Sequence, residues 1–279
     1  MPMPTIFFIN LDRSQERLAL MQAQADKLGL AFERVSAIDG TRRLPGWMVA
    51  QFLDDRGQVR GGLSDGEVGC YASHLLVMST IVERRLEAAI VLEDDAILDQ
   101  DFEQAACAAV RAAPAGWECI HLSTDFKKAA FPVAGLGFGR SLVRYKRLPV
   151  NSLGYIVSRA GAAKLLEARH RVRPFDLEFR LAWLSGLEIF GTYPALARAN
   201  ERLETTIQAA WKDRGCTATR TRWKPSWASR VHGWFYVMVR LKPAGALRSW
   251  TRSTRDRAHL PSPAASRDWE FARSHNGKP

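Results

Sequence analysis

The sequence has no long hydrophobic run. No uncharged apolar stretch approaches the roughly 18 residues that a membrane-spanning helix needs. The apolar residues 6–9 are too few for the core of a secretion signal, and they lead directly into Asp12 and Arg13. We therefore expect a protein that acts in the cytoplasm, or on a membrane from its cytoplasmic side.

Cysteine is scarce and scattered. The cysteines are Cys70, Cys107, Cys119 and Cys216, and none has the close spacing of a zinc knuckle or a compact disulfide framework. We expect reduced thiols, most of them in the core. Cys70 lies four residues before His74 on one face of a predicted helix, but these two side chains alone leave a zinc ion two ligands short. A core cysteine and a hydrogen-bonded histidine near the site are the simpler interpretation.

Acidic residues are rare at the carboxyl-terminal end. The chain of 279 residues has 40 Lys and Arg against 29 Asp and Glu, which gives a net charge of +11. Residues 1–209 hold 25 basic and 25 acidic side chains, whereas residues 210–279 hold 15 and 4, which equals the entire excess. Six of the nine tryptophans lie in the same segment. The charge therefore belongs to the tail and not to the main domain.

This partition predicts three regions: a main domain over residues 1–209, a basic, tryptophan-rich segment over 210–251 and a disordered tail over 252–279. An apolar helical stripe in the middle region consists of Trp223, Trp227, Val231, Trp234, Val237, Met238 and Leu241. Such an amphipathic helix is suited to an anionic membrane surface, which attracts each nearby cation by about 1 kcal/mol. Packing on the main domain is the alternative. Nucleic acid is not an expected partner, because no nucleic-acid-binding fold accompanies the charge.

The first forty residues have the pattern of an α/β nucleotide-binding domain. With 47% hydrophobic and 25% charged residues the composition is that of a globular protein. Residues 6–11 read as a strand buried on both faces, and residues 14–28 as a helix with Gly29 at its carboxyl-terminal cap. A second strand over 32–38 ends at Asp39. Strand, helix and strand in this order open many parallel sheets.

Residues 41–63 look like a loop-rich insertion. Ser64 and Glu67 then form a capping-box pattern that opens a helix to about residue 87, and the apolar residues 88–92 form a strand. The remaining predictions are helices over 101–112 and 158–167, strands over 118–122, 154–157 and 187–193, an irregular stretch over 125–147 and an apolar segment over 176–184.

Three consecutive carboxylates, Glu93, Asp94 and Asp95, end the strand abruptly. A buried charge is unfavourable by several kcal/mol unless it is paired or bound to metal. The carboxyl end of a strand faces the crevice where open α/β sheets bind ligands. Strand alternation directs Glu93 and Asp95 to one side and Asp94 to the other. These oxygen donors suit Mg²⁺ or Mn²⁺. A solvated turn is the alternative, but the apolar strand before the triplet favours metal.

Several motifs carry a family resemblance. The main two are residues 65–74 (DGEVGCYASH) and residues 90–95 (IVLEDD), and further pieces are residues 9–13 with Glu16 and Arg17, residues 37–40, residues 154–158 and residues 161–166. Together they resemble glycosyltransferase family 25, which includes lipopolysaccharide and lipooligosaccharide glycosyltransferases. The resemblance covers about residues 5–208.

The resemblance implies a GT-A-type nucleotide-sugar-binding fold with a Rossmann-like mixed sheet, to which the basic amphipathic segment is appended. It also implies a metal-dependent, inverting transfer of a hexose, most often galactose from UDP-galactose, onto a lipopolysaccharide, lipooligosaccharide or other saccharide acceptor. Glu93, Asp94 and Asp95 would hold Mn²⁺ or Mg²⁺ against the donor diphosphate and so neutralise its developing charge. Asp94 is in addition a candidate catalytic residue.

Asp176 matches a Pro-x-Asp position of the family. It is the candidate for the base that takes the acceptor proton, or for a second contact to metal or acceptor, and an Asx turn after Pro174 is the alternative. The residues expected to bind the UDP-sugar are Asn10, Asp12, Arg13, Asp39, Ser73 and His74, although strand ends and small packing positions also carry such residues for structural reasons. Phe175 and Arg198 depart from the family pattern, which has a smaller aliphatic residue and Gln there.

Two other functions stay open. A metal-dependent phosphoryl hydrolase could use the same acidic triplet, although no phosphate-binding glycine loop lies beside it. A transferase-like domain without activity could bind membranes through its tail. The first expectation is a transferase, peripheral to the cytoplasmic face of a bacterial inner membrane, that extends a lipid-linked saccharide.

Overall fold

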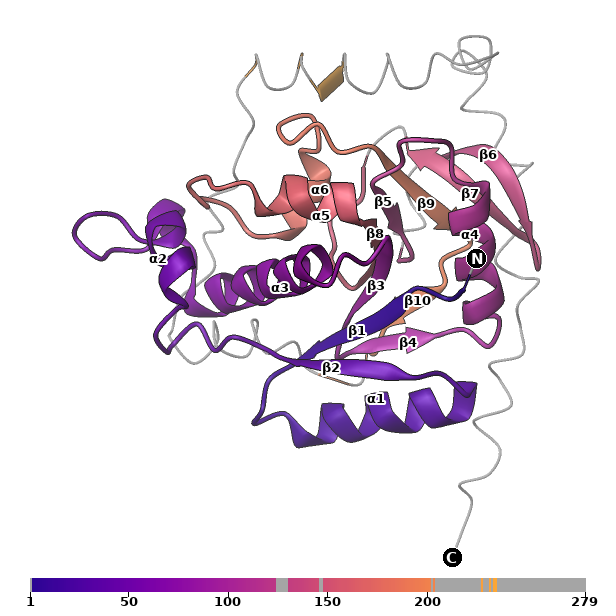
Figure 1. Cartoon of the computed structure of the whole chain (residues 1–279), viewed down its shortest axis with the longest axis horizontal. Helices are drawn as coiled ribbons and strands as arrows, with labels where there is room; N and C mark the ends of the chain where they lie inside the picture. The colour runs from indigo at the N-terminus through magenta and orange to yellow at the C-terminus, as the bar shows by residue number, and fades with distance from the viewer. Residues whose placement is uncertain are drawn as a thin grey trace, which may run out of the picture.

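The computed structural model of the chain describes residues 2–123, 130–145, 148–201 and 203, together with Trp227, Val231, Gly233 and Trp234. A mixed sheet of eight strands lies at the centre, with helices on both faces (Figure 1). The helices are α1 (Gln15–Leu28), α2 (Gly46–Phe52), α3 (Asp65–Glu83), α4 (Phe102–Ala112), α5 (Arg159–Leu166) and α6 (Asp176–Arg180), with a short 3₁₀ turn, η1 (Arg60–Gly62). The strands of the main sheet are β1 (Thr5–Asn10), β2 (Phe32–Ser36), β3 (Ala88–Glu93), β5 (Cys119–His121), β6 (Ala130–Gly137), β7 (Arg140–Tyr145), β8 (Gly154–Ser158) and β9 (Ile189–Tyr193). A separate pair is formed by β4 (Ala96–Leu98) and β10 (Ala197–Ala199).

The main sheet has the strand order β2-β1-β3-β8-β5-β9-β7-β6. β1 runs parallel to both β2 and β3, whereas β8 is antiparallel to β3 and β5. The carboxyl ends of β1, β2 and β3 therefore meet at one edge, the place where open α/β sheets bind ligands. The predicted α/β class, the mixed sheet and the opening unit of strand, helix and strand are confirmed.

Two apolar cores flank the sheet, because its central strands bury both faces. Ala89 and Val91 of β3 pack on the side of α3, α5 and α6, while Ile90 and Leu92 pack on the side of α1 and α4. The alternation of side chains along a strand thus fixes which helix each residue at the end of β3 can reach.

Residues 125–147, which were predicted to be irregular, require a correction. From Ala130 to Tyr145 the chain forms the β6 and β7 hairpin at an edge of the main sheet. Gly137 and Gly139 adopt positive φ angles around the turn, and two register shifts interrupt the pairing. A bulged edge hairpin has no regular alternation of apolar and polar residues, so its glycines suggested a loop.

The insertion over residues 41–63 also holds more structure than predicted. It contains α2, whose Met48 and Phe52 side chains are completely buried in the core beside α3. A helix of two turns is too short to show a helical repeat in the sequence, which explains why a loop was expected.

The basic segment is described at four positions. Trp227 and Trp234 are 79% and 54% exposed and Val231 is also exposed, so these three members of the predicted stripe face outward. Gly233 lies against Trp183, since a Cβ atom at Gly233 would come within 2.9 Å of the indole ring. The other members of the stripe and the predicted disordered tail lie outside the described residues. Within the described residues, no helix combines the length and the apolar character required to cross a membrane.

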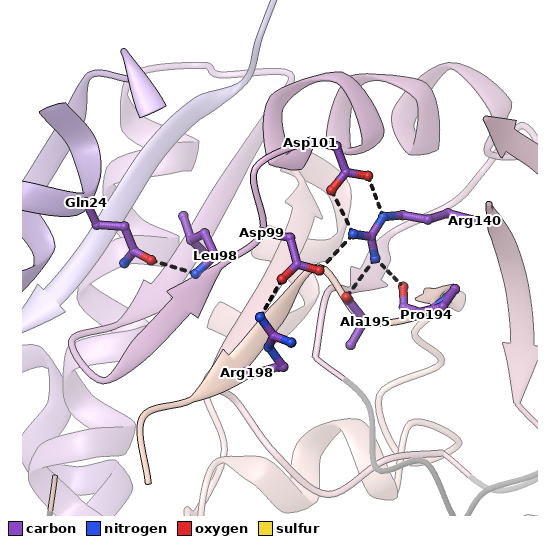
Figure 2. Close-up of polar contacts among 8 residues, drawn as sticks. All are labelled: Gln24, Leu98, Asp99, Asp101, Arg140, Pro194, Ala195 and Arg198. Atoms are coloured by element: carbon purple, nitrogen blue, oxygen red, sulfur yellow. Dashed lines mark hydrogen bonds and ion pairs between the residues drawn. The ribbon is translucent and has the colours of Figure 1, made fainter. Parts of the chain in front are cut away.

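Gln24 on α1 holds the short strand β4 in place (Figure 2). Its side-chain oxygen accepts a hydrogen bond from the Leu98 amide at 2.6 Å, and its side-chain nitrogen donates to the Ala96 carbonyl at 2.9 Å. One amide side chain therefore pairs with β4 as a neighbouring strand would, which satisfies backbone groups that the two-stranded pair leaves open.

Arg140 at the start of β7 connects the region after β4 to the loop before β10 (Figure 2). It donates to both carboxylate oxygens of Asp101 and to Asp99, each at 2.7 Å. It also donates to the carbonyls of Pro194 and Ala195. The other oxygen of Asp99 accepts a hydrogen bond from Arg198 at 2.7 Å. We call these four charged side chains, Arg140, Asp99, Asp101 and Arg198, the Arg140 network.

Candidate active site

The amino-terminal turn of α3 anchors the loop after β2. The predicted capping box is present, with the Ser64 hydroxyl accepting from the Glu67 amide and the Glu67 carboxylate accepting from the Ser64 amide. Gly40 and Gly69 let the two backbones approach so closely that a Cβ atom at Gly69 would lie 2.5 Å from the Ile38 carbonyl oxygen. The loop after β2 is therefore fixed against α3.

Ser73 completes this anchor. Its hydroxyl accepts a hydrogen bond from the Ile38 amide at 2.8 Å and donates to the Gly69 carbonyl at 2.7 Å. Because the side chain is fully buried, these contacts give Ser73 a structural role in placing residues 37–40. A direct contact of Ser73 with a donor, which the sequence suggested, stays a prediction.

Asp39 and Arg13 meet at the carboxyl ends of β2 and β1. Asp39 accepts hydrogen bonds from the Thr41 hydroxyl and amide and pairs with Arg13. The hydrogen bonds from Thr41, and then the contact with Arg13, hold the pKa of Asp39 below its ordinary value. Asp12 points instead to β2, where it accepts from Ser36. Asp39 and Arg13 therefore form a charged pair at the predicted ligand-binding edge, beside which Asp12 is a separate, exposed carboxylate.

Asp94 is held on the α1 side of the sheet. One of its oxygens accepts from Arg17 at 2.7 Å and the other from the Asn10 side chain at 2.8 Å. Asn10 is almost completely buried and uses its own side-chain oxygen to accept from Arg34. Both oxygens of Asp94 thus have a nitrogen donor, and its negative charge is balanced by Arg17.

Glu93 faces α3, on the opposite side. Its carboxylate accepts a hydrogen bond from the Ser152 hydroxyl at 2.5 Å and lies 3.6 Å from Nε2 of His74. Burial alone would raise the pKa of Glu93, but the contacts with His74 and Ser152 outweigh it and lower the pKa below the ordinary value. Glu93 is therefore ionised although it is largely enclosed.

Asp95 differs from both of its neighbours. Its backbone carbonyl accepts from the Asn200 amide at 2.8 Å, which fixes the turn after β3. Its Oδ1 atom is buried and has no hydrogen-bond partner among the described residues. Burial, and next the negative charge of Glu93, raise the pKa of Asp95 from 3.8 to about 6. An enclosed carboxylate oxygen without a donor is the arrangement that a cation would satisfy.

Asp176 begins α6 and lies in the same neighbourhood. Burial raises the pKa of the Cys70 thiol well above its ordinary range, and the negative charges of Glu93, Asp176 and Asp95 raise that pKa further. We call Glu93, Asp95 and Asp176 the carboxylate cluster, because the negative charge of each raises the pKa of the Cys70 thiol. Such an accumulation of negative charge in a partly enclosed place is unfavourable for folding and is typical of functional sites.

His74 adjoins the carboxylate cluster through Glu93, whose nearer oxygen is 3.6 Å from Nε2. Its Nδ1 atom is 2.8 Å from the Tyr155 hydroxyl, and its ring stacks on Phe175 with the centroids 4.1 Å apart and the planes 6° from parallel. This contact explains why a large aromatic residue stands at position 175, where the family has a smaller aliphatic one: the Phe175 ring covers the face of the imidazole. His74 is buried, as the simpler interpretation of the sequence predicted.

The structure thus divides the predicted site residues into groups. Glu93, Asp95 and His74 lie on the α3 side, Asn10 and Asp94 on the α1 side, and Arg13 with Asp39 at the edge between them. Sequence reasoning assigned no role to Arg17, Ser152, Tyr155 or Arg140. Arg17 and Tyr155 belong to motifs of the family resemblance, which were the available signals for them. Ser152 and Arg140 form contacts that only the fold brings about.

Comparisons with known proteins identify a family and several similar proteins. Residues 3–178 match the family described as "Glycosyltransferase family 25 (LPS biosynthesis protein)". A "Glycosyltransferase 25 family member" of Drosophila melanogaster is 31% identical over 174 residues, and "Procollagen galactosyltransferase 2" of Mus musculus is 28% identical over 171 residues. A third similar protein is "Procollagen galactosyltransferase 1-B" of Xenopus laevis, 30% identical over 179 residues.

These matches cover 58% to 59% of this chain but only 27% to 28% of the relatives. The chain therefore spans a little over a quarter of the length of the curated relatives that it matches. The matched family region contains the acidic triplet, α3 and Asp176, and it ends before β9 and the basic segment.

Proposed function

Because the chain belongs to glycosyltransferase family 25, we propose that it transfers galactose from UDP-galactose to a saccharide hydroxyl, with inversion at the sugar carbon and with the help of a divalent cation. The fold assumed in this proposal is of the GT-A type. The names of the similar proteins support galactose as the sugar. The single observation that carries the chemistry is Asp95, a buried carboxylate oxygen without a hydrogen-bond donor at the ligand-binding edge of the sheet.

The residues present fit a hard divalent cation. Asp95 and Glu93 offer carboxylate oxygens, the preferred ligands of Mn²⁺ and Mg²⁺. Burial, and next the negative charge of Glu93, raise the pKa of Asp95, and a bound cation would offset both effects. When bound, the cation neutralises the charge that develops on the leaving diphosphate. In this proposal Asp95 and Glu93 hold it.

Asp94 acts differently in this proposal. Arg17 and Asn10 already occupy its two oxygens, so it is a poor ligand and a poor base. Its contacts tie the turn after β3 to α1 and β1, which positions Asp95. We assign Asp94 to positioning, in place of the metal-binding and catalytic roles considered from the sequence.

Asp176 is the proposed base. Asp176 belongs to α6, whereas Asp95 follows β3. The negative charges of both carboxylates add to the burial that raises the pKa of the Cys70 thiol. Inversion requires a base on the face of the sugar opposite the leaving group, and two carboxylates from different elements can occupy two faces. Asp176 would accept the proton of the acceptor hydroxyl as that oxygen bonds to the sugar carbon and the bond to the diphosphate breaks.

The nucleoside is proposed to lie along the ends of β1 and β2. Arg13 carries a positive charge suited to the diphosphate, and Asp39 has an oxygen that can accept from ribose hydroxyls. The close backbone contact of Gly40 with Gly69 and the Ser73 anchor keep Asp39 in place without a ligand. Such preorganisation lowers the entropy that donor binding must overcome.

The acceptor is proposed to be a lipid-linked saccharide at an anionic membrane surface on the cytoplasmic side. The charge of the tail supports this, since all of the +11 lies in residues 210–279. Trp227 and Trp234 face outward, as membrane-interface tryptophans do. The family description, which names lipopolysaccharide biosynthesis, points to the same class of acceptor.

The chemistry is tested by UDP release from UDP-galactose, in the presence of Mn²⁺ and octyl-linked saccharides as acceptors. Asp95→Asn is expected to lower kcat/KM by about 100-fold or more, as for the loss of a group that stabilises charge in a transition state. Asp55→Asn, which changes an exposed carboxylate in the insertion, is the matched control and should keep full activity. Equal activity of the two variants would overturn the assignment of Asp95. Phosphate release from a phosphomonoester, without any use of UDP-galactose, would favour the hydrolase instead.

The membrane part has its own test. The full chain should sediment with vesicles of phosphatidylglycerol and not with vesicles of phosphatidylcholine, and 0.5 M salt should weaken the binding by screening the charges, since the Debye length falls to about 4 Å. The double variant Trp227→Ser, Trp234→Ser should bind less tightly, whereas Leu184→Ser, an exposed apolar side chain on the main domain, should not. Equal binding of all three proteins would contradict the role of the stripe.

A further inference from the structure

Three potential metal ligands lie together on the α3 side of β3. Cys70, His74 and Glu93 each offer one ligand atom, and these atoms all lie within 4.8 Å of one another. We propose that these side chains form a second cation site, which binds a thiophilic divalent ion such as Zn²⁺. This site differs from the one proposed for the donor cation, because it uses a thiol and an imidazole and because two of its three ligands come from α3.

Local structure brings the three ligands together. Cys70 and His74 are four residues apart on α3, so their side chains project from the same face of the helix. Glu93 ends β3, and the alternation of that strand turns it toward α3 rather than α1. In the sequence, Cys70 and His74 had no third ligand nearby. The sheet supplies one in Glu93.

The orientation of His74 is the second, independent observation. The side chain is 1% exposed, and Nδ1 contacts the Tyr155 hydroxyl at 2.8 Å while Phe175 covers the ring face. Nε2 is left 3.6 Å from the nearer Glu93 oxygen, too far for a hydrogen bond, and has no hydrogen-bond partner among the described residues. A buried nitrogen that faces a carboxylate and a thiol without a hydrogen bond indicates a place for a metal ion.

The distance between His74 and Glu93 suits zinc. Tetrahedral zinc with bonds of about 2.0 Å to nitrogen and oxygen and about 2.3 Å to sulfur separates neighbouring ligand atoms by roughly 3.3 to 3.5 Å. The observed 3.6 Å between His74 and Glu93 is close to such an edge. Three protein ligands leave the fourth position to water, and the soft sulfur selects Zn²⁺ over Mg²⁺ or Mn²⁺.

The surroundings supply the contacts that metal ligands need. The Tyr155 hydroxyl orients His74 through Nδ1, and the Ser152 hydroxyl orients Glu93. Binding converts the Cys70 thiol to a thiolate and releases its proton to solvent. The carboxylates that now disfavour a thiolate at Cys70 would favour the cation, because its two positive charges lie between them.

Glu93 belongs to both sites. A zinc ion at Cys70 and His74 would draw the Glu93 carboxylate away from the cluster with Asp95 and Asp176, so we expect Zn²⁺ to inhibit transfer. This consequence rests on the proposed function, whereas binding of the ion does not.

Titration of the full, reduced chain with Cd²⁺ tests the site directly, because a cadmium–thiolate bond gives a charge-transfer band in the ultraviolet. One equivalent of Cd²⁺ should produce the band, Zn²⁺ should displace it, and Cys70→Ser should abolish it. Cys107→Ser, which removes a half-buried thiol on α4, and Cys216→Ser should retain the band. A band that persists in Cys70→Ser, or no band in the wild-type chain, would overturn the proposal.

Two further measurements guard against a variant that fails to fold. In the wild-type chain, Zn²⁺ should protect Cys70 from iodoacetamide at least 10-fold better than Mg²⁺ does, as read by mass spectrometry of its peptide, and equal alkylation rates would contradict the site. Tyr155→Phe should weaken Zn²⁺ binding by about 10-fold, the effect expected when a group that orients a ligand is lost.

Activity then separates the two proposals. If the chain uses UDP-galactose, Zn²⁺ should inhibit the wild type and should inhibit Cys70→Ser at least 10-fold less strongly. If the chain does not use UDP-galactose but binds Cd²⁺ through Cys70, the proposed function fails and the cation site stands.

Discussion

Two groups of carboxylates lie only a few residues apart on the chain and are treated in opposite ways. Asp99 and Asp101 follow β4 and belong to the Arg140 network, where every carboxylate oxygen has a guanidinium partner (Figure 2). Glu93 and Asp95 precede β4; next to burial, the charge of Glu93 raises the pKa of Asp95, and the charges of Glu93, Asp176 and Asp95 raise the pKa of the Cys70 thiol. Each carboxylate oxygen of the first group is paired with an arginine, whereas in the second group Oδ1 of Asp95 has no hydrogen-bond partner among the described residues.

This difference separates structure from function. Arg140 ties together β7, the region after β4 and the loop before β10, and it needs no ligand to do so. Within the carboxylate cluster, burial and then the negative charge of Glu93 raise the pKa of Asp95, so the ionised form of Asp95 is unfavourable for folding at neutral pH. Charge kept in this way is what a site for cations requires, and it is the reason to place the chemistry there.

The largest loss of stability is expected from the balanced group. Arg140→Met leaves Asp101 enclosed without a cation, and breaking a buried ion pair from one side destabilises proteins by about 3 to 5 kcal/mol. Urea unfolding at pH 7 measures the change. Arg159→Met, which removes an exposed arginine whose side chain donates to the Arg85 carbonyl, should change the free energy of unfolding by about 0.5 kcal/mol or less. A loss below about 1 kcal/mol for Arg140→Met would show that solvent already balances Asp101.

In the carboxylate cluster, a substitution is expected to raise the unfolding free energy and not to lower it. Asp95→Asn removes one of the facing charges, so the metal-free protein should gain about 1 to 3 kcal/mol of unfolding free energy, by the relation between pKa shift and stability. The same variant is expected to lose transfer activity. Thermal unfolding in a chelating buffer, with Asp55→Asn as the control, measures the gain. A variant that is less stable than the wild type would mean that Asp95 has an internal partner after all.

The difference in unfolding free energy between Asp95→Asn and the wild type should depend on pH. The pKa of Asp95 in the folded chain, about 6, lies above its ordinary value of 3.8. The stability linked to this shift is fully present below pH 3.8 and is lost as the pH rises through 6. The advantage of Asp95→Asn over the wild type should therefore be small at pH 4 and reach its full size near pH 7. Unfolding free energies between these values, measured without metal, provide the test; a constant difference would refute the raised pKa.

Much of the site could be predicted because its signals are local. The apolar run of β3 followed by Glu93, Asp94 and Asp95 indicates a buried strand that ends at a binding edge, and strand alternation places Glu93 and Asp94 on opposite sides. The capping box of Ser64 and Glu67 likewise lies within one helical turn. Each of these patterns depends on neighbours in the sequence and on the geometry of a single element.

The division of roles could not be predicted because it depends on distant partners. Asp94 is balanced by Arg17, 77 residues away, and Glu93 is oriented by Ser152, 59 residues away. The triplet itself does not indicate which of its three carboxylates will pair with an arginine from another part of the chain. The same holds for Arg140, whose carboxylates and carbonyls come from both sides of it in the sequence and meet only when β7 joins the sheet edge.

The smallest effect is expected at Arg198, where the family resemblance led us to expect Gln. Arg198 pairs with Asp99, but its side chain is 46% exposed, whereas that of Arg140 is 9% exposed. Exposed ion pairs contribute about 0 to 1 kcal/mol, and Arg140 still holds the other oxygen of Asp99. Arg198→Gln should therefore lower the unfolding free energy by less than about 1 kcal/mol, and the difference should vanish in 1 M salt, where the Debye length is about 3 Å. A loss of unfolding free energy as large as that of Arg140→Met would mean that the exposed Arg198 contributes as much as the buried Arg140 to balancing Asp99 and Asp101. In that case the contrast between the two acidic regions would rest on the number of arginines near each of them rather than on their enclosure.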